Sequence, residues 1–255
     1  MRYFLFILFL SSLAGAHSVE RKNPPQYQFS VDQNESGIQE ADLWTLLKIL
    51  DQEFGAALGG NLESWTRDVV WSQPYIGAGS NIYQDQFYIL LYGGFVRARY
   101  MTVGALSAIL CHELGHKLGG EPRQIFLGEV HWSSSEGQAD MFAAGTCMPK
   151  LYDRLLEMKS ALLTNQMEHS TEKLCENSKN VSRCRWVATS GIDFVQMAQV
   201  YFDIDVPWAN PEQWSEDEVA ETLSSRYPSY QCRMDIYKAA AVDPASPRLR
   251  CWFHP

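Results

Sequence analysis

Apolar residues recur at helical spacing near the start of the chain and then change period. The first set lies on one face of a helix that Gly59-Gly60 ends, and its members are Leu43, Leu46, Leu47, Leu50 and Phe54. Between residues 61 and 99, short runs rich in Trp, Val, Ile and Tyr alternate with Pro and Gly. These runs, 65–71 and 87–92, predict a small sheet.

Helical patterns dominate after residue 100. One helix is expected from Thr102, a suitable N-cap, to Leu118, where Gly119-Gly120 ends it. A second begins at Ser134 or Ser135 and continues at least to Thr146. Further helices are expected over 151–167, 192–202 and 216–223, with a polar loop over 175–184. This order predicts an α+β fold, mostly helical with a small N-terminal sheet, in a single domain over residues 41–255 that follows a loose segment, 17–40.

The N-terminus has the pattern of a secretory signal. An apolar run from Tyr3 to Leu10 precedes Ala14-Gly15-Ala16, an A-x-A cleavage pattern that predicts a signal peptide over residues 1–16, removed after Ala16. The alternative is a membrane anchor, but this segment is shorter than the about 20 residues that span a bilayer. We therefore expect a secreted or periplasmic protein with no integral membrane segment once the signal is removed.

Composition and net charge limit the classes of partner that the protein can bind. The chain has 255 residues, 46% hydrophobic and 20% charged, as in an ordinary folded protein. Its formal net charge of −9 provides no excess of cations for phosphate groups, so we expect no nucleic-acid partner.

Six cysteines in an exported chain suggest disulfides. Fifteen pairings are possible for six cysteines, so the connectivity stays open. The first pairings to consider are the local ones, Cys175–Cys184 and Cys232–Cys251, which leave Cys111 and Cys147.

The candidate chemistry begins with H-E-x-x-H in the helix that starts at Thr102. His112 and His116 are one helical turn apart, so both imidazoles lie on one face and can bind one Zn²⁺. Glu113 is rotated away from that pair and is placed to act as the general base. A surface His–Glu–His cluster is the alternative, but the apolar flanks predict a buried helix, where unpartnered polar groups are costly.

A third ligand is expected from the next helix, in Glu136-Gly137-Gln138-Ala139-Asp140. Glu136 would complete a His₂Glu site with one position left for water. Asp140, one turn further on, would accept the free ring N–H of His112 and orient that ring. The alternative is that both acids simply favour a helix N-terminus.

These motifs resemble those of the gluzincin metallopeptidases. H-E-L-G-H followed by E-G-Q-A-D-M-F-A is similar to the CAAX-prenyl-protease/HtpX-type family, whose second motif is E-x-x-A-D. The resemblance implies a zincin-like fold and a zinc-dependent endopeptidase with ligands His112, His116 and Glu136 and with base Glu113. The first hundred residues carry no such resemblance.

A third family motif, T/S-H-P-x-x-x-x-R, is matched only in part. Pro228 and Arg233 keep its spacing, but Tyr227 stands where the family has a histidine that helps to hold the oxyanion. Tyr227 and Arg233 are therefore candidate oxyanion donors. The alternatives are that Tyr227 packs beside Pro228 at a helix start and that Arg233 pairs with Asp140 or Glu136.

The sequence thus predicts an exported zinc peptidase that acts on protein or peptide substrates. A non-catalytic binding or scaffold protein that keeps zinc as a structural element is the main alternative. A metallohydrolase of amide bonds outside proteins is a third.

Overall fold

The computed structural model describes residues 28–255 except positions 168 and 204. The predicted signal peptide, residues 1–16, and the part of the loose segment before residue 28 lie outside the described residues. The part from 28 to 39 has no helix or strand, although its Ile38 is buried. Of the described residues, about 48% are helical and 12% are in strands, which form two small sheets. The predicted α+β class is therefore confirmed.

The N-terminal part combines the predicted helix and sheet. Its elements are α1 (Glu40–Leu58), α2 (Leu62–Trp65), β1 (Asp68–Val70), β2 (Ala78–Tyr83) and β3 (Gln86–Tyr92). Helix α1 ends at Gly59, whose φ of 76° is left-handed and suits glycine. The sheet has the order β1-β3-β2, with β1 parallel and β2 antiparallel to β3. Only residues 68–70 of the first predicted run form a strand, because Trp65 still belongs to the short helix α2 and a turn follows it.

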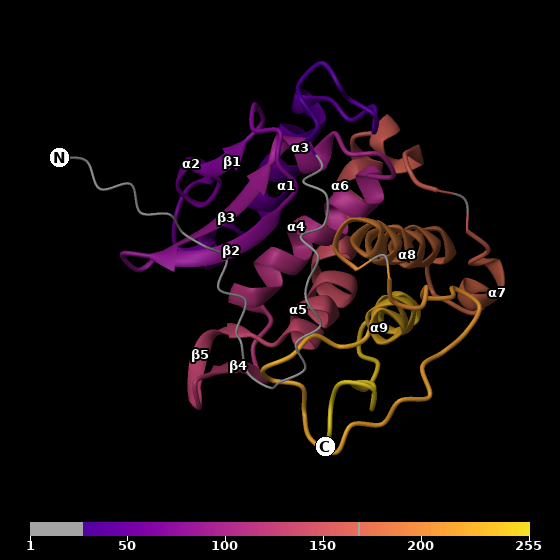
Figure 1. Ribbon diagram of the computed structural model, residues 1–255. Coiled ribbons are helices and arrows are strands. Elements are labelled where there is room, and N and C mark those ends of the chain that lie inside the picture. The colour runs from indigo at the N-terminus through magenta and orange to yellow at the C-terminus, as the bar shows by residue number, and fades with distance from the viewer. Residues whose placement is uncertain (1–27, 168, 204) are drawn as a thin grey trace.

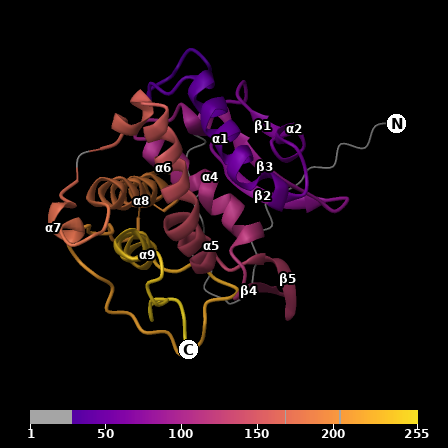
Figure 2. The same cartoon turned by 180° about the vertical axis from the view of Figure 1, so that it is seen from behind.

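Helix α4 (Val103–Leu118) runs through the middle of the molecule and follows the short helix α3 (Gly93–Val96). Its predicted N-cap is confirmed, because the Thr102 hydroxyl accepts a hydrogen bond from the Ala105 N–H at 3.0 Å. The three-stranded sheet packs on one side of α4, and helices α5 (Glu136–Phe142) and α8 (Val181–Phe202) pack on the other (Figure 1). The view from behind shows α1 beside the sheet (Figure 2). Residues 103–116 are all buried as a result.

A β-hairpin occupies the connection after α4, where the sequence suggested only a short crossover. Its strands are β4 (Arg123–Phe126) and β5 (Glu129–Ser134). Helix α5 (Glu136–Phe142) follows and continues through a π-helical turn, Ala143–Cys147, into α6 (Met148–Glu157). The predicted helix from 135 to at least 146 is thus confirmed.

Three expectations for the C-terminal half are wrong, at least in part. The helix expected over 151–167 stops at Glu157, because Lys159 adopts a positive φ of 50°; a short 3₁₀ helix, Ala161–Thr164, follows. Both ends of the expected loop 175–184 are helical, in α7 (Glu172–Cys175) and α8 (Val181–Phe202).

No helix forms over 216–223, because its backbone pairs with the C-terminal segment. The N–H of Val219 donates to Arg250 O at 2.9 Å, and that of Leu223 to Trp252 O at 2.8 Å. Helix α9 (Tyr230–Val242), which follows this segment, was not predicted.

Three disulfides are present: the two local pairs considered first, and the pair that they leave. They are Cys111–Cys147, Cys175–Cys184 and Cys232–Cys251. Such bonds fit an extracellular protein. Within the described part of the chain, none of the helices combines the length and the apolar character needed to cross a bilayer.

Candidate metal centre

The two helices that carry the candidate ligands touch through their backbones. A Cβ atom on Gly115 of α4 would lie only 2.7 Å from the carbonyl oxygen of Ala139 in α5, so only glycine allows this approach. The Cys111–Cys147 disulfide links the same two parts of the chain. The glycine of H-E-L-G-H therefore brings α5 close enough for its carboxylates to reach the histidines.

His112, His116 and Glu136 converge. The Nε2 atom of His112 lies 3.2 Å from Glu136 Oε2, and that of His116 lies 3.8 Å from Glu136 Oε1. One donor atom from each residue lies within 4.8 Å of the others, and all three residues are buried. Two tetrahedral ligands of one zinc ion are separated by about 3.4 Å. The group is therefore able to hold a metal ion.

Hydrogen bonds at the other ring nitrogens fix both imidazoles. His112 Nδ1 lies 2.8 Å from Asp140 Oδ1, the contact expected from the sequence, and His116 Nδ1 lies 3.0 Å from the carbonyl oxygen of Ser134. Both partners are acceptors, so each Nδ1 carries the proton and donates. The Nε2 atoms are then directed toward Glu136.

Asp140 is in turn held by Arg233 of α9. The guanidinium donates from Nε to Asp140 Oδ2 at 2.7 Å and from Nη2 to Asp140 Oδ1 at 2.9 Å. Burial disfavours the ionised carboxyl, but the charges of Arg233 and His112 outweigh it and lower the pKa of Asp140 to about 2. The pairing with Asp140, one alternative for Arg233, is thus present.

The ligands also shift one another's protonation. Burial disfavours the charged ring of His112, yet the Asp140 carboxylate prevails and raises the pKa of His112 to about 10. Burial also disfavours ionised Glu136, but the charges of His116 and His112, with a smaller effect of Arg233, lower the pKa of Glu136 to about 2. Glu136 is therefore an anion at neutral pH.

A large cleft opens beside the histidines. Its volume is about 1510 Å³, and both His112 and Glu113 line it. Glu113 is only 8% exposed, so its carboxylate is shielded from most solvent. Aromatic and acidic side chains form much of the remaining wall, including Phe194, Trp208, Trp214, Glu216 and Asp217.

Tyr227 and Arg233 lie at the same cleft. Tyr227 is 68% exposed and lies with Pro228 just before Ser229, the N-cap of α9. The Arg233 guanidinium carbon lies 5.7 Å from the centre of its ring. The negative charge of Glu136 raises the pKa of Tyr227. Its hydroxyl therefore stays protonated and able to donate near neutral pH.

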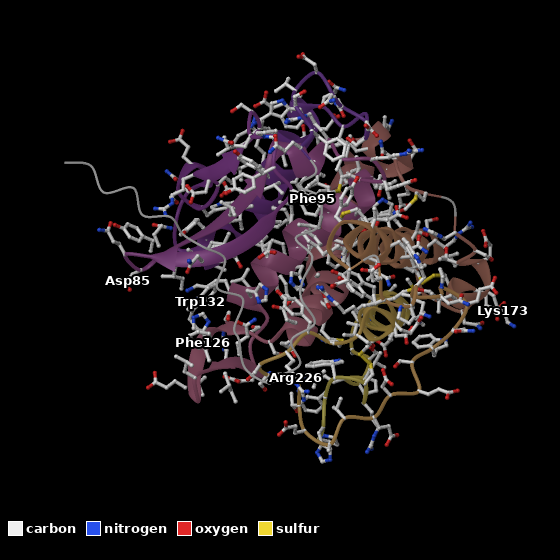
Figure 3. The ribbon with its side chains drawn as sticks, viewed as in Figure 1. Asp85, Phe95, Phe126, Trp132, Lys173 and Arg226 are labelled. Carbon is white, nitrogen blue, oxygen red and sulfur yellow. A yellow bond between two sulfur atoms is a disulfide. The ribbon has the colours of Figure 1, made fainter. Side chains whose placement is uncertain are left out.

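Sequence reasoning missed the contribution of the β4–β5 hairpin. Gln124 donates from Nε2 to Glu136 Oε1 at 3.1 Å, and the Ser134 carbonyl holds His116. Trp132 lies where the hairpin meets the three-stranded sheet (Figure 3), and its ring packs edge-on against Phe87, 6.2 Å between centres. No spacing rule marks these residues, because their roles depend on the fold of the hairpin.

Comparisons with known proteins assign no family. No protein family matched the chain, and no similar protein was found among curated sequences or among solved structures.

Proposed function

We propose that this protein is an exported zinc-dependent peptidase, with a zincin-like domain over residues 41–255 and Glu113 as its general base. The observation that carries the proposal is the buried group His112, His116 and Glu136 beside a cleft that Glu113 lines. The resemblance of its motifs to those of gluzincin metallopeptidases supports the same conclusion.

The residues present fit zinc. Two imidazoles and one carboxylate are a common ligand set of catalytic zinc, which keeps a fourth position open. Among the described residues, buried Glu136 Oε2 has no hydrogen-bond partner, as expected for an atom whose partner is a metal ion. Bound there by His112, His116 and Glu136, zinc would polarise the scissile carbonyl and make a water molecule more acidic.

Glu113 performs the proton transfers. As a carboxylate it takes a proton from the water whose oxygen attacks the scissile carbonyl carbon. It then returns that proton to the amide nitrogen, so that the C–N bond breaks and a neutral amine leaves. Because Glu113 is mostly shielded from water, bulk solvent competes weakly for that proton.

Tyr227 is the better placed of the two candidate oxyanion donors. Its protonated hydroxyl is at the exposed edge of the cleft and is able to donate to the negative charge that develops on the carbonyl oxygen. Arg233 already gives two hydrogen bonds to Asp140, so its main part is to hold Asp140 against His112. Its positive charge still favours the oxyanion at short range.

The cleft and the disulfides indicate the kind of substrate and its location. A volume of about 1510 Å³ accommodates several residues of an extended peptide, and its aromatic wall offers apolar contacts. The three disulfides fit an extracellular protein, so we place the enzyme among secreted or periplasmic proteins that cleave proteins or peptides outside the cytosol.

Hydrolysis of an unstructured protein tests the proposal. We expect the purified chain to cleave casein, to lose that activity with a chelator and to regain it with Zn²⁺. Glu113→Gln should retain zinc but lose at least about a hundredfold in rate, because the amide cannot accept the proton. Glu136→Gln should lose much of the zinc as well. Zinc content is measured by elemental analysis on the same samples.

The control is Glu129→Gln, the same change at an exposed position of the hairpin, which should leave cleavage unaltered. A zinc-loaded wild type that cleaves neither casein nor a peptide library would refute the peptidase and favour the scaffold alternative. Full activity of Glu113→Gln would remove Glu113 from the mechanism.

A further inference from the structure

A chain of hydrogen bonds leads from the β4–β5 hairpin to a candidate metal ligand. His131 Nδ1 lies 2.8 Å from Ser133 Oγ, and that hydroxyl donates to Gln124 Oε1 at 2.7 Å. Gln124 Nε2 then donates to Glu136 Oε1 at 3.1 Å. Each link joins side chains, and Ser133 is only 3% exposed.

These hydrogen bonds all donate in the same direction, from His131 toward Glu136. A serine hydroxyl has a single proton, and Ser133 gives it to Gln124, so Ser133 accepts from His131. The side-chain amide of Gln124 then has its oxygen toward Ser133 and its nitrogen toward Glu136. Rotating that amide by 180° would set its oxygen against a carboxylate oxygen, which has no proton to donate. The carboxylate of Glu136 therefore fixes which end of Gln124 it meets, and Ser133 holds the opposite end by donating to Oε1.

An irregularity of the hairpin creates this contact. The strand register shifts between Arg123, which pairs with Ser134, and Ile125, which pairs with Val130. Residues 131–133 are thus accommodated opposite Gln124 alone. Such bulges redirect side chains and are frequent beside active sites. The same hairpin offers the Ser134 carbonyl to His116, so it supports two of the three candidate ligands.

The two oxygens of Glu136 differ as a consequence. Oε1 accepts the Gln124 hydrogen bond, whereas buried Oε2 has no hydrogen-bond partner among the described residues and lies 3.2 Å from His112 Nε2. We infer that Gln124 is a positioning residue that occupies Oε1 of Glu136 and presents Oε2 as the metal ligand. This inference rests on metal binding by the three ligands and is independent of peptidase activity.

Metal titration of Gln124→Leu tests the inference, because leucine has a similar size and cannot donate. We expect the Zn²⁺ affinity, measured by competition with a chelator on the purified full chain, to fall by about 10–100-fold. Titration with Co²⁺ alone adds a spectroscopic signature. The visible bands should weaken as Glu136, no longer held at Oε1, becomes free to bind through both oxygens and raises the coordination number.

Two further variants separate positioning from folding. Ser133→Ala, which removes the hydrogen bond that holds Gln124 Oε1, should produce a smaller change in the same direction. Gln86→Leu makes the matched change in β3 and should leave affinity and spectrum unaltered. An affinity within about twofold of wild type with an unchanged Co²⁺ spectrum, in a Gln124→Leu protein with native circular dichroism, would overturn the inference. If Gln124→Leu does not fold, the same result for Ser133→Ala overturns it.

Discussion

Replacing Asp140 by asparagine tests how much the hydrogen bonds and ion pair behind the candidate ligand His112 contribute to stability. Asp140 is fully buried and accepts hydrogen bonds from His112 and from two nitrogens of Arg233. Asparagine has the shape of aspartate but no charge. Its NH₂ group would face an N–H donor of His112 or Arg233, where aspartate presents an acceptor oxygen. The Arg233 cation would then stay buried beside His112 without its carboxylate.

The loss of folding free energy in Asp140→Asn can be calculated in two ways. Removing one partner of a buried ion pair typically costs about 3–5 kcal/mol. The pKa of Asp140, lowered from its ordinary 3.8 to about 2, corresponds to about 2 kcal/mol of folding free energy for the carboxylate. We therefore expect Asp140→Asn to lower the free energy of unfolding of the metal-free protein by about 2–5 kcal/mol.

Urea unfolding of metal-free protein, followed by circular dichroism, measures this loss. A depressed carboxyl pKa contributes stability above the unfolded value of 3.8 that disappears as the pH falls toward 2, so the difference between wild type and Asp140→Asn should shrink below about pH 4. The double variant Asp140→Leu/Arg233→Met removes both charges and should be more stable than Asp140→Asn. A loss under about 1 kcal/mol at pH 7 would refute the reasoning, since that is the size of an ordinary hydrogen bond.

Three further predictions concern the same region. Because the Asp140 carboxylate raises the pKa of His112 to about 10, binding must displace its proton, and the apparent Zn²⁺ affinity should rise by up to about tenfold per pH unit from pH 7 to 9; a chelator competition series that stays flat over this range would contradict it. Trp208→Ala, at the half-exposed wall of the cleft, should raise KM for peptides by about tenfold with little change in kcat; steady-state kinetics that show only a lower kcat would exclude a binding role. Replacing both Cys111 and Cys147 by alanine opens a loop of 36 residues and should lower the unfolding free energy by about 4 kcal/mol; an unchanged urea midpoint would contradict it.

The helices that follow local rules could be predicted from the sequence. Thr102 and Gly119 bound α4 almost as capping preferences require, and the apolar period of α1 ends at Gly59. The segment 216–223 could not be predicted, because its backbone N–H groups bond to carbonyls near the C-terminus. Contacts between segments distant in sequence, which no window of the sequence contains, decided that region.

Some residues of the candidate site could likewise be identified from the sequence, and others could not. Helical spacing places His112 and His116 on one face, and the acid pattern identifies Glu136, so these residues could be selected from the sequence. Gln124 could not, because it reaches Glu136 only through a register shift in a hairpin that the sequence did not predict. Its neighbours supply no periodicity, and glutamine is common in exposed strands.

The charges around the site provide a separate argument for a divalent cation. The carboxylates of Glu113, Glu136 and Asp140 face a single guanidinium, that of Arg233, and all four groups are buried. With neutral imidazoles the cluster therefore carries two negative charges, which a protein interior does not tolerate without compensation. Without a cation His112 would take up a proton, as its raised pKa indicates. One divalent ion would restore neutrality while leaving both rings unprotonated at Nε2. The same residues thus satisfy both the geometric and the electrostatic requirements of one divalent ion. A monovalent cation would neutralise only one of the two negative charges.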